Sequence, residues 1–146
     1  MSEQITHITS AEQESPELVL AEHVHAGFPS PAADNTERID ITHELIRHPE
    51  TTFYARIEGN SMEDAGIFNG DLVVIDRSLQ ASDGDYVAAY IDGEFTIKEF
   101  RSDPSHECAW LIPHNGKYHP IRVDESNSFL VWGVITHTIH KVKGEK

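Results

Sequence analysis

The first lysine of the sequence, Lys98, lies within a predicted strand, residues 94–100, rather than at the tip of a loop. If Asp92-Gly93 forms the two-residue turn of a hairpin, Val87 lies opposite Lys98 and mostly apolar side chains surround the amine. Loss of hydration lowers the pKa of a lysine, and a fall of about three units, from ~10.4 towards ~7, would make the amine a general base. The pattern alone favours a second interpretation, in which the side chain extends past Phe100 so that its ammonium group reaches water.

A serine that such a base could activate is Ser61, in the segment Glu58-Gly-Asn-Ser-Met-Glu-Asp-Ala-Gly66 that follows a predicted strand. A serine hydroxyl is a weak nucleophile until a base removes its proton. Gly59 and Asn60 favour a turn with unusual dihedral angles, and the backbone N–H groups of Asn60 and Ser61 could then stabilise an oxyanion. An ordinary turn serine fits the same residues, and without further information it is the better-supported interpretation.

The ten histidines raise the question of a metal site. His23-x-His25 and His137-x-x-His140 are closely spaced, but neither an HExxH motif nor a pair of cysteines accompanies them. We therefore expect neither a metal nor another cofactor. A Ser-His-Asp triad can assemble from distant segments, but the sequence lacks the GxSxG elbow that would identify its nucleophile.

Short strands must position the serine and the lysine. Six segments are rich in β-branched and aromatic residues and are separated by Gly, Asn, Asp and Pro, a pattern typical of strands. These segments are residues 52–58, 71–76, 85–91, 94–100, 110–114 and 128–138. Residues 40–48 have the apolar spacing of a short amphipathic helix, which Pro49 ends. The sequence thus predicts a mostly-β domain with one short helix.

The chain has 146 residues and a net charge of −14, and its acidic residues are unevenly distributed. Residues 1–26 contain five glutamates and neither lysine nor arginine, which indicates a poorly packed arm. Within this arm, residues 17–22 could form a short strand or a turn of helix. Residues 27–39 include a proline-rich stretch and are predicted to be an extended linker. The folded domain is then expected to span residues 40–146.

Charge, hydropathy and cysteine content exclude several classes of function. Direct, sequence-specific DNA binding needs clustered basic residues, which a chain of charge −14 does not favour. The sequence contains no apolar run of the ~18 residues that a membrane-spanning helix needs, and its N-terminus is acidic rather than a basic leader. The single cysteine, Cys108, fits a reducing compartment. We therefore expect a cytoplasmic protein without a membrane anchor.

Several motifs follow one another in a characteristic order. They are Gly59-Asn-Ser-Met62, Gly70-Asp-Leu-Val-Val-Ile-Asp76, Gly84-Asp-Tyr-Val87 and Asp92-Gly-Glu-Phe-Thr-Ile-Lys98. Together they resemble the LexA/UmuD family of self-cleaving proteins. The segment Phe28-Pro-Ser-Pro-Ala-Ala-Asp34 is similar to the UmuD branch of that family, the SOS mutagenesis proteins. The resemblance extends from about Ala26 to the C-terminus and implies a curled, multi-stranded β domain like the LexA/UmuD C-terminal domain, carrying an extended N-terminal arm.

The resemblance also implies an activity and the residues that perform it. The family uses a Ser/Lys dyad to cleave its own N-terminal arm, which makes Ser61 the nucleophile and Lys98 the neutral-amine general base. The family's scissile bond joins a small residue to glycine, here Ala26-Gly27. UmuD-like sites often have cysteine before this glycine, and Ala26 is the choice of LexA-like sites. The backbone N–H groups of Asn60 and Ser61 would hold the oxyanion.

The partners implied by the resemblance are those of the SOS response. A RecA filament on single-stranded DNA would promote cleavage, and the processed homodimer would join a UmuC-like Y-family polymerase in error-prone translesion DNA synthesis. The replication clamp is a further candidate partner. A LexA-type repressor would need a basic N-terminal DNA-binding domain, whereas the 26 residues before the expected bond contain five glutamates and neither lysine nor arginine. Two alternatives are a non-enzymatic module that regulates a polymerase or processivity factor, and a peptidase of other proteins related to signal peptidases.

Overall fold

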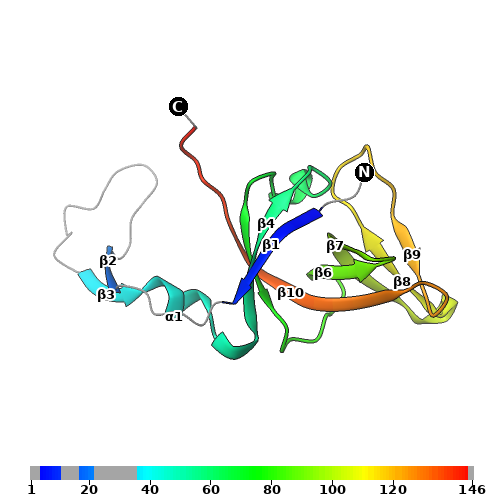
Figure 1. Cartoon of the computed structure of the whole chain (residues 1–146), viewed down its shortest axis with the longest axis horizontal. Coiled ribbons are helices and arrows are strands. Elements are labelled where there is room, and N and C mark those ends of the chain that lie inside the picture. Colours follow the sequence, from blue (N-terminus) through cyan, green and yellow to red (C-terminus); the bar gives the residue numbers. More distant parts are fainter. Residues whose placement is uncertain (1–3, 11–16, 22–35, 145–146) are drawn as a thin grey trace.

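The computed structural model describes residues 4–10, 17–21 and 36–144, and within these ranges one antiparallel sheet of eight strands dominates. Its order is β1 (Gln4–Ser10), β4 (Thr52–Glu58), β5 (Leu72–Asp76), β10 (Phe129–Ile139), β6 (Tyr86–Ile91), β7 (Glu94–Asp103), β8 (Cys108–Ile112) and β9 (Ile121–Val123) (Figure 1). A separate hairpin joins β2 (Glu17–Ala21) to β3 (Thr36–Asp40). This architecture confirms the predicted mostly-β fold of the LexA/UmuD type.

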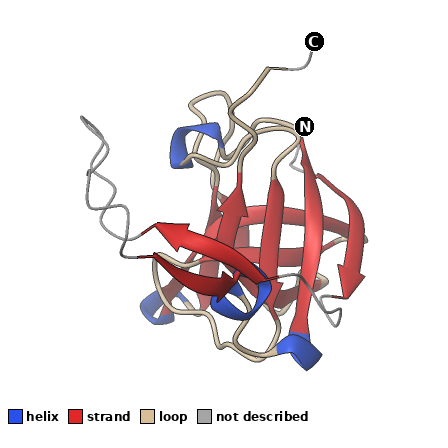
Figure 2. Cartoon of the chain, turned by 90° about the vertical axis from the view of Figure 1, so that its left-hand side faces the viewer, coloured by secondary structure: helices blue, strands red, loops and turns tan. Residues whose placement is uncertain are grey.

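Within the described ranges, helical structure is confined to short segments between strands (Figure 2). They are the α-helix α1 (Ile41–Leu45) and the 3-10 turns η1 (Pro49–Thr51), η2 (Glu63–Ala65) and η3 (Pro104–His106). Asp40 caps α1 by accepting a hydrogen bond from the His43 N–H at 3.2 Å. The predicted helix over residues 40–48 is too long, because Ile46 has extended backbone angles and is buried against Val74.

The β6–β7 hairpin has the register that the sequence predicts. Val87 pairs with Lys98, and the pairing continues to the last residues before the turn. Asp92 and Gly93 both have positive φ, at 49° and 87°. A type I′ turn requires positive φ at both central positions, and the Asp-Gly dipeptide tolerates it. This turn therefore determines where Lys98 lies along the sheet.

The long strand β10 is the centre of the sheet. Its first half pairs with β6 and its second half with β5, and the register shifts between Val131 and Gly133 and again between Ile135 and His137. Such bulges bend a strand and increase its twist, which allows β10 to pair with two strands, β5 and β6. A Cβ at Gly133 would lie 2.5 Å from Ile75 Cγ2, so this position requires glycine for close packing against β5.

Among the described residues, the two larger apolar clusters form the core of the domain. The first, against which Tyr86 and Trp132 also pack, consists of Ala55, Ile57, Met62, Ile67, Val73, Ile75, Ala88 and Ile97. The second consists of Val87, Ala89, Leu111, Val123 and Val134. Because neighbouring residues of β6 and β7 alternate between the two clusters, both faces of this hairpin are packed. Lys98 follows Ile97 directly, and both residues are buried.

The strand boundaries agree with the sequence predictions in most places. Strand β4 matches its predicted range, whereas β7 continues beyond Phe100 and β8 begins at Cys108, before the predicted residue 110. Strand β9 was not predicted, because three residues carry too little periodic signal. Its position is determined by pairing with β8, a contact between distant segments.

Two segments of the N-terminal arm, residues 4–10 and 17–21, form strands, although the composition of the arm indicates poor packing. The prediction of a poorly packed arm is wrong for residues 4–10, which form β1 and pair with β4 from Gln4 opposite Glu58 to Ser10 opposite Phe53. Strand β3 occupies the end of the predicted linker. Ala26 and Gly27 lie outside the described residues, and the boundaries 1–26, 27–39 and 40–146 stay predictions. None of the helices in the described ranges is long and apolar enough to span a membrane.

Candidate active site

Ser61 lies in a tight turn between β4 and η2. The turn starts at Gly59, whose φ of 102° is in the region that favours glycine, whereas Asn60 does not have the positive φ that its type would allow. The Gly59 N–H donates to Asn69 Oδ1 at 2.9 Å. Met62, the residue after the serine, is fully buried in the first apolar cluster. The turn is thus anchored on both sides of Ser61, which is itself 0% exposed.

Lys98 reaches this turn from the middle of β7. Its side chain is 2% exposed, so the interpretation in which the ammonium group reaches water past Phe100 is wrong. The amine Nζ lies 3.1 Å from Ser61 Oγ, and it donates to Thr96 Oγ1 at 2.6 Å and to the Ile97 carbonyl at 3.0 Å. The structure therefore brings together the serine and the lysine that the sequence singled out, 37 residues apart in the chain.

This arrangement has the elements of nucleophilic catalysis. Burial penalises an ammonium ion more than a neutral amine, since the charge loses its hydration. A neutral amine has two N–H bonds and one lone pair. Thr96 Oγ1 and the Ile97 carbonyl are placed to accept the two N–H bonds, which directs the lone pair to the Ser61 hydroxyl. A hydroxyl 3.1 Å from a basic nitrogen is within reach of proton transfer.

Residues 114–118 form hydrogen bonds to the serine turn, and no motif in the sequence indicates this contact. The His114 N–H donates to the Ser61 carbonyl at 2.7 Å, and the Asp64 N–H donates to the His114 carbonyl at 2.8 Å. Asn115 Nδ2 donates to the Asn60 carbonyl at 2.9 Å. Asn115-Gly116 is a turn dipeptide, but a dipeptide cannot indicate which distant turn it will contact.

A buried carboxylate connects this loop to β7. Glu99, next to Lys98, accepts hydrogen bonds from Arg101 Nε and from His114 Nε2, the latter at 2.7 Å. Burial acts to raise the pKa of Glu99, but the hydrogen bonds from Arg101 and His114 prevail and lower it. Tyr86 packs edge-on against the His114 ring, with 5.5 Å between ring centroids. Glu99 is thus held as a carboxylate that fixes the His114 side chain.

The histidines do not gather into a metal site in the part of the chain that the structure describes. Within those residues there is no group of three or more His, Cys, Asp or Glu side chains that could hold a metal ion. His140 instead bonds to Asp71 Oδ1 at 2.5 Å, and His48 bonds to Asp76 Oδ2 at 2.6 Å. These two histidines therefore have structural partners.

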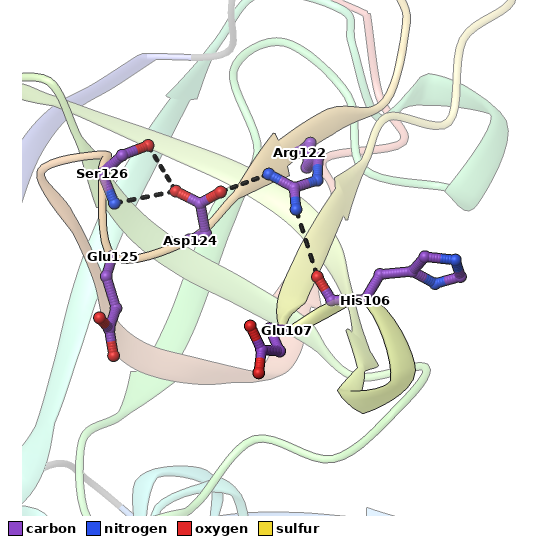
Figure 3. A pocket seen from close by; sticks show the side chains of 6 residues that line it. All are labelled: His106, Glu107, Arg122, Asp124, Glu125 and Ser126. Carbon is purple, nitrogen blue, oxygen red and sulfur yellow. Dashed lines mark hydrogen bonds and ion pairs between the residues drawn. The ribbon is translucent and has the colours of Figure 1, made fainter.

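An open pocket lies at the far end of β9, away from Ser61 and Lys98 (Figure 3). Its lining is polar and charged and consists of His106, Glu107, Arg122, Asp124, Glu125 and Ser126. Arg122 pairs with Asp124, whose Oδ1 accepts two hydrogen bonds from Ser126. These side chains satisfy one another, and the pocket contains neither Ser61 nor Lys98. This pocket is therefore not the candidate active site.

Comparison with known proteins agrees with the geometry of the buried pair. Residues 18–136 match the Peptidase S24-like family. The chain belongs to the peptidase S24 family. Protein MucA of Escherichia coli is 40% identical over 120 residues, which cover 81% of this chain and 80% of MucA. Protein SamA of Salmonella typhimurium is 40% identical over 126 residues, which cover 86% of each chain.

A third relative shows the limits of the similarity within this peptidase family. The LexA repressor of Corynebacterium jeikeium is 41% identical over 120 residues, which cover 82% of this chain but 43% of the repressor. The similarity to that protein thus spans less than half of the repressor's length. Together with MucA and SamA, this pattern identifies the chain as a UmuD-like member of the family.

Proposed function

We propose that this UmuD-like chain is an SOS mutagenesis protein that cleaves itself between Ala26 and Gly27, with Ser61 as nucleophile and Lys98 as general base. The observation that carries the proposal is the 3.1 Å separation of Ser61 Oγ and Lys98 Nζ, both from buried residues. Membership of a peptidase family supports hydrolysis as the reaction. The sequence Ala26-Gly27 supplies the small residues that a peptide lying flat across the pair would need.

The proposed reaction proceeds through an acyl-enzyme. The Lys98 amine takes the Ser61 hydroxyl proton as Oγ attacks the Ala26 carbonyl carbon, and the C=O π electrons move to the oxygen. When the tetrahedral intermediate collapses, the C–N bond breaks and the Lys98 ammonium returns its proton to the Gly27 nitrogen. An ester then joins Ala26 to Ser61. Water attacks this ester with Lys98 again as base, which releases residues 1–26 as a free acid and restores the hydroxyl.

The negative charge of the tetrahedral intermediate needs hydrogen-bond donors. We assign this role to the backbone N–H groups of Asn60 and Ser61, which lie in the anchored turn. Donors that are fixed before the reaction do not have to reorganise as the charge develops, so they stabilise the intermediate more effectively than water does. The removal of one such donor typically slows acyl transfer by about 10²–10³-fold.

The resemblance supports a set of partners for the processed form. RecA on single-stranded DNA would favour the arm conformation in which Ala26-Gly27 lies across the pair, a shift in population rather than added chemistry. The shortened protein would act as a homodimer, joining a UmuC-like Y-family polymerase and the replication clamp in translesion synthesis. The net charge of −14 agrees with a role that reaches DNA through protein partners.

Alkaline incubation of the purified protein tests the proposal. Deprotonation of Lys98 should replace part of the activator's effect, and mass spectrometry should find a product that begins at Gly27. Ser61→Ala and Lys98→Ala proteins should stay intact under the same conditions. Cleavage that persists in either variant would refute the assignment of the pair. An intact wild-type chain would favour the alternative of a non-enzymatic module that regulates a polymerase.

A further inference from the structure

Both peptide groups that flank Ser61 are held by the same distant loop. The carbonyl of Asn60 accepts from Asn115 Nδ2 at 2.9 Å, and the carbonyl of Ser61 accepts from the His114 N–H at 2.7 Å. The Asn60 carbonyl also accepts a longer turn bond, 3.3 Å, from the Glu63 N–H. Two consecutive carbonyl groups are thus bound by adjacent residues of one loop.

Planarity of the peptide bond passes this constraint to the N–H groups. In a trans peptide the carbonyl of one residue and the N–H of the next lie in one rigid plane and point in opposite directions. When Asn115 holds the Asn60 carbonyl, it also fixes the direction of the Ser61 N–H. In the same way, the His114 N–H fixes the direction of the Met62 N–H. The loop therefore sets the orientation of the serine turn without contacting the reacting atoms.

Two side-chain bonds make this loop rigid with respect to β7 and the turn. Tyr118 Oη donates to Asn60 Oδ1 at 2.9 Å. His114 Nε2 bonds to Glu99 Oε1 at 2.7 Å, and Glu99 is the neighbour of Lys98 along β7. The loop thus ties the turn that carries the serine to the strand that carries the lysine.

We infer that residues 114–118 form a positioning clamp for the oxyanion donor of Ser61, with Asn115 as its central residue and Tyr118 as its support. The inference rests on the proposed self-cleavage and adds the residues that orient its transition-state donor. Asn115 is 8% exposed, and its amide has two separate tasks. Nδ2 donates to the Asn60 carbonyl and, at 3.4 Å, to Glu63 Oε1 just after the serine turn, whereas Oδ1 accepts from the Lys117 N–H at 3.0 Å within the clamp itself.

These separate tasks allow the clamp's effect on the turn to be removed while its own fold is kept. Asn115→Asp retains an acceptor for the Lys117 N–H but places a carboxylate oxygen against the Asn60 carbonyl. Asn127→Asp is the matched control, because Asn127 Oδ1 accepts from the Asp124 N–H at 3.0 Å in a loop remote from Ser61. Tyr118→Phe deletes one hydroxyl, and the control Tyr90→Phe deletes the hydroxyl of an exposed tyrosine in β6.

The experiment measures the first-order rate of self-cleavage of each full-length protein as a function of alkaline pH. Asn115→Asp should lower the plateau rate by about 10–100-fold while the midpoint of the pH profile stays at its wild-type value, because Lys98 is untouched. Tyr118→Phe should lower the plateau by about threefold, and both controls should match the wild type. Melting temperatures, measured in a Ser61→Ala background so that every chain stays intact, should change by a few degrees at most.

The outcomes separate this inference from the proposed function. If wild-type protein cleaves and folded Asn115→Asp cleaves at the same rate, the clamp is refuted and the Ser/Lys assignment stands. A midpoint that moves with an unchanged plateau would also overturn the inference, since the loop would then act through Lys98. If Asn115→Asp fails to fold, Tyr118→Phe decides, and a wild-type rate in that variant refutes the clamp. A wild-type chain that stays intact refutes the proposed self-cleavage itself.

Discussion

The Ser61 turn and the open pocket between η3 and β9 show two opposite ways of using polar side chains. At the turn, Ser61 and Lys98 are buried, and their hydrogen bonds reach backbone groups and hydroxyls of the packed sheet. At the pocket, Arg122, Asp124 and Ser126 lie near the surface and bond mainly to one another. Water screens the second set, whereas the first set must be satisfied by the protein.

This difference bears on which of the two regions can support proton transfer. A buried amine responds strongly to its surroundings, because the protein replaces its hydration shell. A solvent-exposed ion pair contributes little and keeps nearly ordinary chemistry. Near the pocket, hydrogen bonds from His106 and Trp110 are the main cause that lowers the pKa of Asp103, to about 2. Even so, Asp103 stays an ordinary carboxylate at neutral pH.

The largest predicted effect comes from the same substitution made in both regions. Lys98→Met keeps an unbranched chain in the packed site but removes the base, so self-cleavage should fall by at least about 10³-fold. Arg122→Met should leave the rate within about twofold, because its guanidinium lies in the screened pocket. Band intensities on denaturing gels over time measure both rates. Equal losses of the cleavage rate in the two variants would contradict the proposed difference between the two regions.

A second prediction compares two carboxylates through stability. Asp76 is buried and accepts hydrogen bonds from His48, Ser78 and Thr51, so Asp76→Asn should lower the free energy of unfolding by about 2 kcal/mol at pH 7. Asp124→Asn, in the open pocket, should leave the unfolding midpoint unchanged. Urea titrations followed by circular dichroism measure both. A larger loss for Asp124→Asn would contradict the comparison.

The pH dependence of the Asp76 effect has a definite sign. Burial acts to raise the pKa of Asp76, but hydrogen bonds from His48, Ser78 and Thr51 lower it overall. A carboxyl whose folded pKa lies below its unfolded value, ~3.9, stabilises the fold above that pH. This contribution is lost as the pH falls through the folded pKa. The difference between wild type and Asp76→Asn should therefore shrink below pH ~4, and a difference that grew there would contradict the assignment.

The third and smallest effect concerns hydroxyl groups. Thr96→Val removes the acceptor 2.6 Å from Lys98 Nζ without changing the shape of the side chain, so the lone pair loses part of its orientation. The cleavage rate should fall by about tenfold. Ser126→Ala removes a hydroxyl that bonds to Asp124 and should leave the rate unchanged. An unaffected Thr96→Val protein would contradict the role of the Thr96 hydroxyl in orienting the amine.

The sequence predicts the parts of the site that depend on local signals. Asp92-Gly93 determines the hairpin register, and the register places Lys98 opposite Val87 among apolar neighbours. The sequence does not reveal β1, because an edge strand in an acidic segment gains its order by pairing with β4. It also does not reveal Asn115, since a loop asparagine has the same local pattern whichever distant turn it binds.

In the proposed reaction, Lys98 acts as a neutral amine that takes the proton of Ser61 when the chain cleaves itself. The most direct test is the first-order rate of appearance of the fragment that begins at Gly27, measured from neutral to strongly alkaline pH. We expect the rate to rise with pH and to level off below pH ~10.4, around which exposed lysines lose their proton. No fragment should appear from the Lys98→Met protein. A rate that does not depend on pH, or a Lys98→Met protein that cleaves like the wild type, would contradict the proposed reaction.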